Sequence, residues 1–351
     1  KSRDKHASFF EIEKEFIKSL DVRVAGRYED FGNDSSFDPK FSFKYLLTDK
    51  IVIRASKSSS FSMPSMAQMF SSDINLGSVR DFNGSSPFVR QAQIGNPSLK
   101  PATSKNTNFG IIFNNTNSKY SIDFWNIDYK NRIEVESAQA ILNSNPNGSS
   151  ITRNSNGDLI GVTTTYFNEE NSEVSGVDIS FETLIDLEKR GILLFAIKGT
   201  SINKFLTPKG GESDEKEEDT EMINRVGKFN YDAHTHSLPK KRINAFIDWD
   251  YLDYGFNLNI RHVDGYTNER PISDLGKTYE YKNKVDSFLV FDLSASKLVK
   301  VYRGQLNIKL SINNIFDEAA PRLYDAPDFS FDTRVHDPRG KIIGIKVEYK
   351  H

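Results

Sequence analysis

Apolar and polar side chains alternate along many segments of this chain. The clearest segment runs from Leu306 to Asn313, where leucine or isoleucine stands at every even position and a polar residue at every odd one. Residues 243–249 and 254–261 repeat this pattern of period two. Successive side chains on a β-strand point to opposite sides. The pattern therefore predicts strands that each have one apolar and one polar face.

The alternation recurs in roughly thirteen segments, and we found no convincing helical period. Many of them are longer than ten residues, whereas a typical strand has about five or six. Residues 11–18 also fit a short helix, but alternation fits them too. The predicted strands span residues 8–17, 20–31, 37–48, 50–58, 104–115, 118–130, 172–187, 189–204, 238–251, 253–266, 284–298, 302–316 and 339–351.

The connections between these segments alternate between short and long. Loops longer than about 12–15 residues without structure of their own are uncommon in compact domains. Transmembrane barrels, in contrast, have short periplasmic turns and longer extracellular loops. The pattern therefore predicts an all-β fold, a transmembrane antiparallel β-barrel. The predicted long loops are polar and rich in turn residues, and they span residues 59–103, 131–171, 205–237, 267–283 and 317–338.

Composition narrows the class of protein. The 351 residues include no run of about 20 apolar residues, which a membrane helix requires. The absence of cysteine excludes disulfides, thiolate metal sites and a cysteine nucleophile. A net charge of -2 gives no reason to expect a nucleic-acid partner. The chain starts at Lys1 with neither an initiator methionine nor a signal peptide, so we expect a fragment or a processed chain.

Several short motifs resemble the C-terminal barrel of TonB-dependent receptors, and together they extend over nearly the whole chain. Their order and spacing carry the resemblance more than any single motif does. The last residue departs from the pattern, since His351 stands where the family usually has phenylalanine. The motifs are VAGRYEDF at 24–31, FDPK at 37–40, IRAS at 53–56, GNPSLKP at 95–101, VSGVD at 174–178, INNIFD at 312–317 and DPRG at 337–340.

The resemblance implies that residues 1–351 are the C-terminal portion of a receptor barrel of about 22 strands. The N-terminal plug domain and the first barrel strands are then not present. It further implies uptake of a scarce nutrient across the bacterial outer membrane, with energy coupled through TonB. The expected partners are the TonB complex of the inner membrane, reached through the plug domain, the outer-membrane lipid, and a siderophore, vitamin, glycan or peptide ligand. Neither a cofactor nor an enzymatic activity is expected.

Ligand contacts are expected in the long loops. Aromatic residues and arginines are enriched where ligands and partners dock. The alternative interpretation is that these side chains pack the loops against themselves and their neighbours. The candidates in loop 59–103 are Phe61, Met66, Phe70, Arg80, Phe82, Phe88 and Arg90, and those in the last long loop are Arg322 and Tyr324.

Other chemistry has weaker support in the sequence. His234 and His236 lie near Asp232, but no third ligand has a recognisable zinc spacing. The acidic run at 212–221 lacks the ligand spacing of a calcium loop and is interpreted as a solvated loop tip. We interpret Asp248 and Asp250 as polar residues that face the lumen of the barrel. No nucleophile elbow, phosphate-binding glycine loop or zinc-protease motif is present.

Two other classes of protein share part of this pattern. A passive porin-type barrel would have the same strands without a plug domain. A soluble or surface-attached β-protein that binds glycans or acts as an adhesin would share the alternation. It would not explain the strand lengths or the gathering of long loops at one end.

Overall fold

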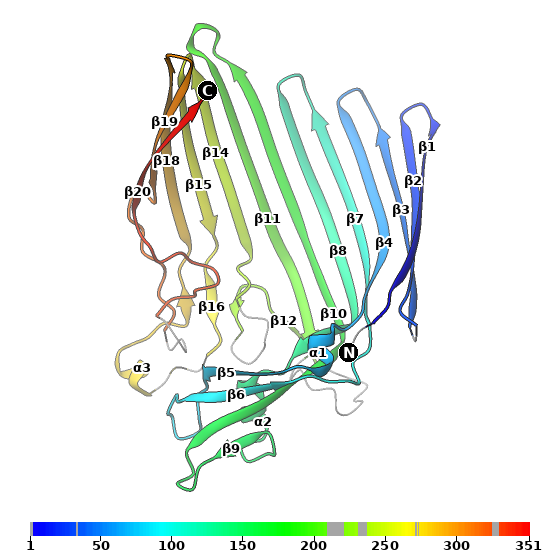
Figure 1. The fold of residues 1–351 in the computed structure, drawn as a ribbon, viewed down its shortest axis with the longest axis vertical. Coiled ribbons are helices and arrows are strands. Elements are labelled where there is room, and N and C mark those ends of the chain that lie inside the picture. The colour runs from blue at the N-terminus through cyan, green and yellow to red at the C-terminus, as the bar shows by residue number, and fades with distance from the viewer. Residues whose placement is uncertain are drawn as a thin grey trace.

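The alternating segments form one long antiparallel meander (Figure 1). The structure is a computed structural model that describes residues 3–32, 34–208, 221–230, 237–270, 272, 274–324 and 330–351. Thirteen strands in these ranges pair in chain order and form a curved wall. They are β1 (His6–Ile17), β2 (Leu20–Asp30), β3 (Ser35–Leu46), β4 (Ile51–Ser62), β7 (Ala102–Asn114), β8 (Ser118–Val135), β10 (Leu159–Asp186), β11 (Ile192–Pro208), β14 (Lys241–Tyr251), β15 (Tyr254–Val263), β18 (Phe288–Val301), β19 (Gly304–Asn313) and β20 (Ile342–Lys350).

Each strand of the wall coincides with one predicted segment, so the predicted all-β barrel fold is confirmed. Most ends agree within a few residues. The main difference is β10, which begins at Leu159 rather than at residue 172. Its first residues pair with short strands that the alternation did not predict.

The remaining elements lie almost entirely at the end of the wall that carries the long connections (Figure 1). The exception is η1, a single 3-10 turn between β10 and β11 at the short-turn end. The others are α1 (Met66–Phe70), β5 (Ser72–Ser78), β6 (Phe88–Ile94), α2 (Ala138–Ser144), β9 (Ile151–Arg153), β12 (Met222–Asn224), β13 (Lys228–Phe229), β16 (Tyr266–Asn268), α3 (Asp274–Thr278) and β17 (Lys284–Val285), while η1 spans Glu188–Arg190. Among the described residues, none of the helices is long and apolar enough to cross a membrane.

One face of the wall is apolar from strand to strand. Cross-strand partners align isoleucines into a row over β4, β7, β8 and β10, and Ile179 in that row is 46% exposed. Contiguous exposed apolar surface of this extent needs a covering medium. A row of this kind on a barrel wall is the surface that faces lipid. Two such rows are Ile53, Ile111, Ile122 and Ile179, and Leu258, Leu293, Ile312 and Ile343.

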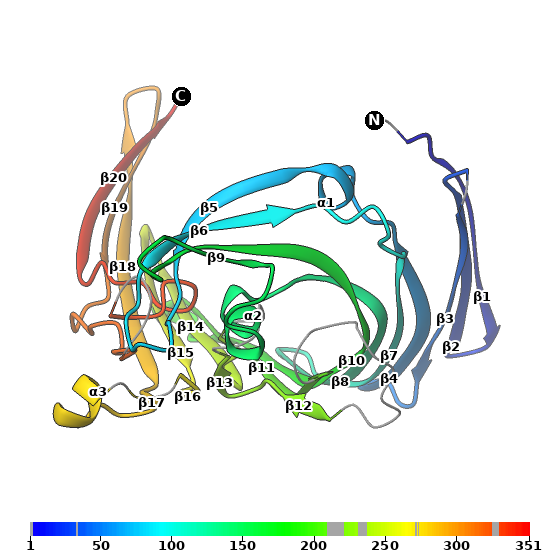
Figure 2. The same ribbon diagram turned by 90° about the horizontal axis from the view of Figure 1, so that it is seen from below.

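The opposite face is polar. Because the apolar face of a barrel wall faces lipid, we assign the polar face to the concave side of the arc. Asp248, which we expected to face the lumen, accepts a hydrogen bond there from Asn257 Nδ2 at 2.6 Å. Viewed along the strands, the wall is an open arc with β1 at one edge and β20 at the other (Figure 2). In the described part of the chain, β1 pairs only with β2 in the wall and β20 only with β19.

The INNIFD and DPRG motifs together direct the chain into its last strand. Asn314, with φ +52°, donates its backbone N–H to Asp292 Oδ1 at 2.8 Å and its Nδ2 to the carbonyl of Glu318 at 2.8 Å. Asp317 Oδ1 accepts the backbone N–H of Lys341 at 2.7 Å. A Cβ on Gly340 would lie 2.7 Å from that same oxygen, so glycine is needed at this close approach.

Candidate functional site

The two longest loops fold together into a small domain at the loop end of the wall. We define this mini-domain as β5, β6, α2, β9 and the first residues of β10 (Figure 1). β5 and β6 form a hairpin, β6 runs parallel to Gly161–Thr165 of β10, and β9 pairs on the other side of β10. The sequence predicted polar loops here, so this sheet is a finding of the structure.

The mini-domain has a hydrophobic core of its own, to which both loops contribute. Leu142 of α2 is fully buried at its centre. Because the core residues come from segments far apart in the sequence, neither loop can bury its apolar side chains alone. The core consists of Val79, Val89, Ala138, Ile141, Leu142, Leu159 and Val162.

A glutamine fixes α2 to the end of β5. The backbone N–H of Arg80 donates to Gln139 Oε1 at 2.8 Å, and Gln139 Nε2 donates to the Arg80 carbonyl at 3.1 Å. Gln139 therefore satisfies both backbone groups of one residue, as a neighbouring strand would. Ser137 caps the helix by accepting the N–H of Ala140.

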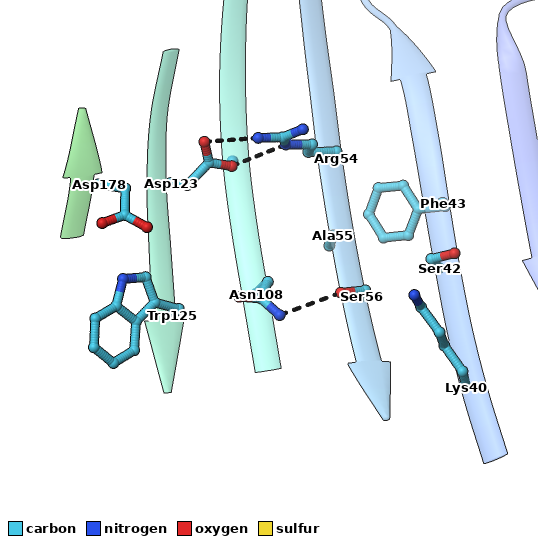
Figure 3. A pocket seen from close by; sticks show the side chains of 11 residues that line it. Lys40, Ser42, Phe43, Arg54, Ala55, Ser56, Asn108, Asp123, Trp125 and Asp178 are labelled. Carbon is cyan, nitrogen blue, oxygen red and sulfur yellow. Dashed lines mark hydrogen bonds and ion pairs between the residues drawn. The ribbon is translucent and has the colours of Figure 1, made fainter. Parts of the chain in front are cut away.

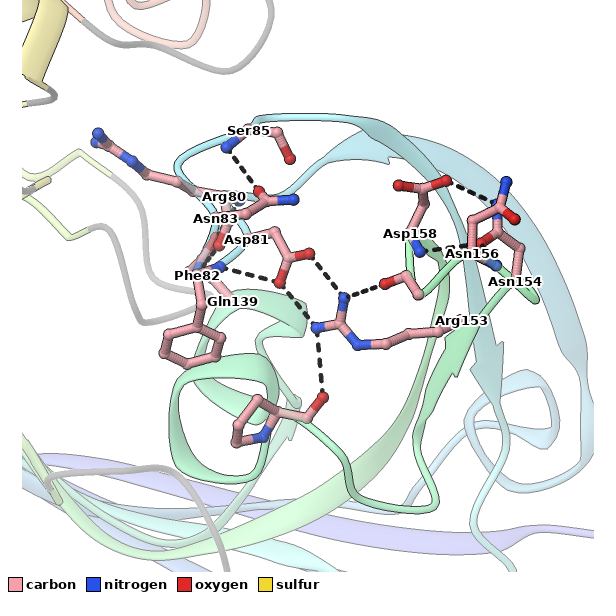
Figure 4. A network of polar contacts seen from close by, with 12 residues as sticks. Arg80, Asp81, Phe82, Asn83, Ser85, Gln139, Arg153, Asn154, Asn156 and Asp158 are labelled. Atoms are coloured by element: carbon pink, nitrogen blue, oxygen red, sulfur yellow. Dashed lines mark hydrogen bonds and ion pairs between the residues drawn. The ribbon is translucent and has the colours of Figure 1, made fainter.

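A bidentate ion pair closes the other side of the mini-domain (Figure 4). Arg153 donates to the two carboxylate oxygens of Asp81 at 2.7 and 2.8 Å, and Asp81 is only 5% exposed. The backbone N–H of Phe82 also donates to this carboxylate, at 2.9 Å. The hydrogen bonds from Arg153 hold the pKa of Asp81 below its usual value, so the carboxylate is charged at neutral pH.

The candidate ligand residues of loop 59–103 occupy separate places in this architecture. Figure 4 shows the Arg80 side chain pointing away from the ion pair, and Phe82 lies exposed in the turn between β5 and β6. Phe88 and Arg90 lie on β6 and are exposed. The structure thus spreads these four residues over the mini-domain and does not gather them around one pocket.

The three other candidates of this loop lie where it leaves the wall. Phe61, near the end of β4, packs against Phe31 with ring centroids 5.9 Å apart. Met66 begins α1 and Phe70 ends it, and Ser65 caps this helix through a capping box with Gln68. For Phe61, packing within the chain is therefore the interpretation that the structure favours.

The candidates of the last long loop connect it to the loop that follows β15. Tyr324 stacks on Tyr281 at 4.5 Å, and its carbonyl accepts a hydrogen bond from Asn268 Nδ2 at 2.9 Å. Arg322 is exposed and forms an isolated bridge with Phe331. Contact of any of the predicted residues with a ligand stays a prediction.

A second buried cluster joins the same two loops. Tyr266 donates its hydroxyl to Asp332 Oδ2 at 2.7 Å, and Ser237 donates to the same oxygen. His336, which is 4% exposed, stacks on Tyr266, and burial lowers its pKa. Burial also raises the pKa of the Tyr266 hydroxyl, so both groups are neutral at physiological pH.

The polar face of the wall carries a hollow of about 420 Å³ (Figure 3). Arg54 of β4 donates from Nε and Nη2 to the carboxylate of Asp123 on β8, at 2.8 and 2.7 Å. Gly110 of β7 lies between them, and a Cβ there would be 2.0 Å from Asp123 Oδ1. A glycine in the middle strand is therefore what lets this ion pair form.

Trp125 and Asp178 border the same hollow (Figure 3). The Trp125 ring lies over Gly176, where a Cβ would come within 2.3 Å of the indole. Asp178 accepts a hydrogen bond from Thr200 Oγ1 at 2.7 Å. The sequence could not show that Arg54 and Asp123 meet, since they are 69 residues apart.

Among the described residues, no group of three or more histidine, aspartate or glutamate side chains could hold a metal ion. Asp232, His234 and His236 lie outside the described residues, as does most of the acidic run at 212–221.

Comparison with known proteins places this architecture among bacterial receptors. The model of the family described as "TonB dependent receptor-like, beta-barrel" matches residues 1–315. No curated protein matches the sequence.

Solved structures show the same fold. The siderophore receptor PirA from Acinetobacter baumannii is similar over 97% of this chain and 44% of its own, with 17% identity and a TM-score of 0.63. A variant of the ferric enterobactin receptor PfeA from Pseudomonas aeruginosa has the same coverage and TM-score with 14% identity. The FrpB iron transporter from Neisseria meningitidis matches 98% of this chain with 12% identity and a TM-score of 0.57. The chain therefore spans less than half the length of these proteins.

Proposed function

Since this chain belongs to the TonB-dependent receptor β-barrel family of the bacterial outer membrane, we propose that it forms part of the wall and loop layer of a nutrient receptor. The complete receptor takes up a scarce nutrient with energy supplied through TonB. In this proposal the chain is the C-terminal portion of the barrel, and a plug domain encoded upstream fills the concave side. An inner-membrane complex then acts on the plug domain.

The main support for this proposal is the presence of the mini-domain. It lies across the concave side of the wall at the loop end (Figure 2). A passive porin needs an open water-filled lumen. A folded domain with its own core, held across the mouth, suits a receptor that binds its substrate and then moves it by energy-coupled work.

A ferric siderophore is the substrate class that we propose. Support comes from the similar structures, which are a siderophore receptor, a ferric enterobactin receptor and an iron transporter. The arginines of the loop layer suit an anionic ligand, because guanidinium groups bind carboxylates and other anions in a bidentate manner. A vitamin, glycan or peptide is the alternative ligand class.

Uptake by cells tests the proposal. The complete receptor is expressed in a strain that lacks its own siderophore receptors, and accumulation of radioactive iron from a panel of ferric siderophores is measured with and without TonB. We expect accumulation of at least one of them, and its loss in the strain without TonB. Accumulation that continues without TonB, or diffusion of small sugars through the purified receptor in liposomes, would support the porin-type alternative.

Transport by the 351-residue chain alone provides the matching control. The plug domain is required for coupling in this proposal, so the chain by itself should not support uptake. Uptake by the isolated chain after reconstitution would contradict the proposal that the plug domain is required for transport.

A further inference from the structure

The hairpin of β5 and β6 presents an apolar surface on the side where a solvated sheet would be polar. Cross-strand register places Leu76 opposite Arg90 and Ile74 opposite Ala92, so their side chains share one face. The same face carries Phe88 and Ile94, which lie opposite serines of β5. We call the four apolar side chains of this face the outer face: Ile74 is 54% exposed, Leu76 75%, Phe88 65% and Ile94 46%.

On the other side of the hairpin, β6 faces the core of the mini-domain, whereas Asp73 and Asn75 of β5 are exposed. Val89 points to this side and is 1% exposed, packed in the cluster that includes residues of α2. The β5 residues on this side are Asp73, Asn75 and Gly77. Along β5 the apolar residues therefore point away from the core, the reverse of the usual arrangement in a half-solvated sheet. A patch of this kind marks an interaction surface.

The position of the hairpin shows where the outer face points. In Figure 2 the hairpin runs across the open side of the arc, and α2 lies on the inner side of it. Its tip contacts the loop that follows β15, where Arg270 Nη2 donates to Ser86 Oγ at 3.3 Å. Because the core side faces α2 and the lumen, the outer face points out of the arc, toward the gap between β1 and β20.

We propose that the outer face is the docking surface for the extracellular loops of the barrel strands that close this gap in the longer receptor. Two observations favour this occupant. The wall strands that border the gap, β1 and β20, each lack a second partner in the described part of the chain. The matched receptors are also more than twice as long as this chain, and the fold agrees over nearly all of it.

If this surface is docked, the mini-domain is held in a fixed position across the mouth of the receptor. It is attached to the wall through α1 and β10, to the opposite loops through Arg270 and Ser86, and to the remaining loops through the outer face. The inference rests on membership of the barrel family and does not depend on which nutrient is transported.

Cysteine labelling tests this docking, and the chain is well suited to it because it contains no cysteine. Leu76→Cys and Phe88→Cys are made in the complete receptor, and reaction with a membrane-impermeant maleimide is followed on intact cells and on the purified monomer in detergent. Ser155→Cys, at an exposed turn of the same mini-domain, is the matched control. Labelling after denaturation measures the total thiol, and heat-modifiable migration verifies that each variant is folded.

We expect Leu76→Cys and Phe88→Cys to react at least roughly tenfold more slowly than Ser155→Cys, in cells and in the purified monomer alike. Equal rates at the three positions would overturn the proposal. Protection that is lost on purification would assign the surface to a separate partner, and protection that is lost on dilution of a dimer would assign it to a second copy. Either result would also overturn it. Iron uptake is not a readout here, so failure of the docking surface and failure of the proposed transport are distinguishable.

Discussion

The wall and the mini-domain of this protein bury their apolar side chains in opposite ways. The wall has one layer of strands, and its apolar rows lie on the convex surface, where residues such as Ile179 are half exposed within the chain. The mini-domain packs a helix and short strands around Leu142, which is completely buried. The exposed surface of the wall is thus suited to lipid, and the buried core of the mini-domain is typical of a domain in water. Strand β10 is part of both regions. Strand β10 therefore runs from the lipid-facing wall into the water-exposed mini-domain as one continuous strand.

The largest expected effect concerns the core of the mini-domain. Leu142→Ala should destabilise this unit by about 2–5 kcal/mol, because a fully buried leucine loses its packing and leaves a cavity. Hydrogen exchange of the complete receptor should show faster exchange in β5, β6 and β9 and no change in β14 or β15. Ser155→Ala, in the exposed turn, is the control. Equal destabilisation of the wall would mean that the two regions unfold together.

A charge on the convex face tests the other half of the comparison. Ile179→Lys should cost about 2–4 kcal/mol in the complete receptor, since a charge on the lipid face must be desolvated. Ser180→Lys places the same charge on the next residue, which faces the lumen, and should cost much less. Urea unfolding in lipid vesicles measures both. Similar costs for the two variants would contradict the assignment of faces.

The ion pair of Asp81 and Arg153 should contribute less than the core. Asp81→Asn keeps the shape of the side chain but removes the charge that the guanidinium faces, and we expect a loss of about 1–3 kcal/mol confined to the mini-domain. Hydrogen exchange of residues 151–159 provides the measurement. Asp158→Asn, in the nearby exposed turn, should have little effect. An equal loss of stability in that variant would show that the buried ion pair contributes no more than an exposed carboxylate does.

The smallest expected effect is a pH dependence at His336. Burial lowers the pKa of this imidazole below its ordinary value of 6.5, so the unfolded loop binds a proton more readily than the folded one. The stability of the cluster is therefore complete above pH 6.5 and is lost progressively as the pH falls from there toward the folded pKa. Hydrogen exchange around Tyr266, corrected for the intrinsic pH dependence of amide exchange, should accelerate as the pH is lowered from about 7 to about 5 in the natural sequence and not in His336→Phe. The same acceleration in the variant would assign the effect to another group.

The sequence indicated the wall far better than the loop layer. In the wall, even and odd positions of a strand point to opposite faces. The face of each residue from Leu306 to Ile312 could therefore be predicted before its cross-strand partner was known. The loop layer has no such local rule. Val79, Leu142 and Leu159 come from three separate segments of polar, turn-rich loops, and only their meeting in space makes them a core. Helix α2 has seven residues, too few for a helical period to be recognised.

The candidate ligand residues show the same limit. Composition identified the aromatic and arginine side chains of the long loops, but it could not show that Phe61 packs on Phe31 or that Tyr324 stacks on Tyr281. It also gave no indication of the hollow beside Arg54 and Asp123. That ion pair depends on Gly110 in the strand between them, and cross-strand neighbours are known only once the register is known.

What this sequence determined by itself is the wall: its strand positions, its two faces and the alternation of short turns with long loops. These follow from local physics, because the direction of a side chain on a strand and the length of a connection are properties of consecutive residues. Only the tertiary structure decided that two long loops share one core, that β10 continues into their sheet and that the apolar side of β5 points away from that core. Those features depend on contacts between distant segments, and the free energy of such a contact cannot be inferred from the sequence of either segment alone.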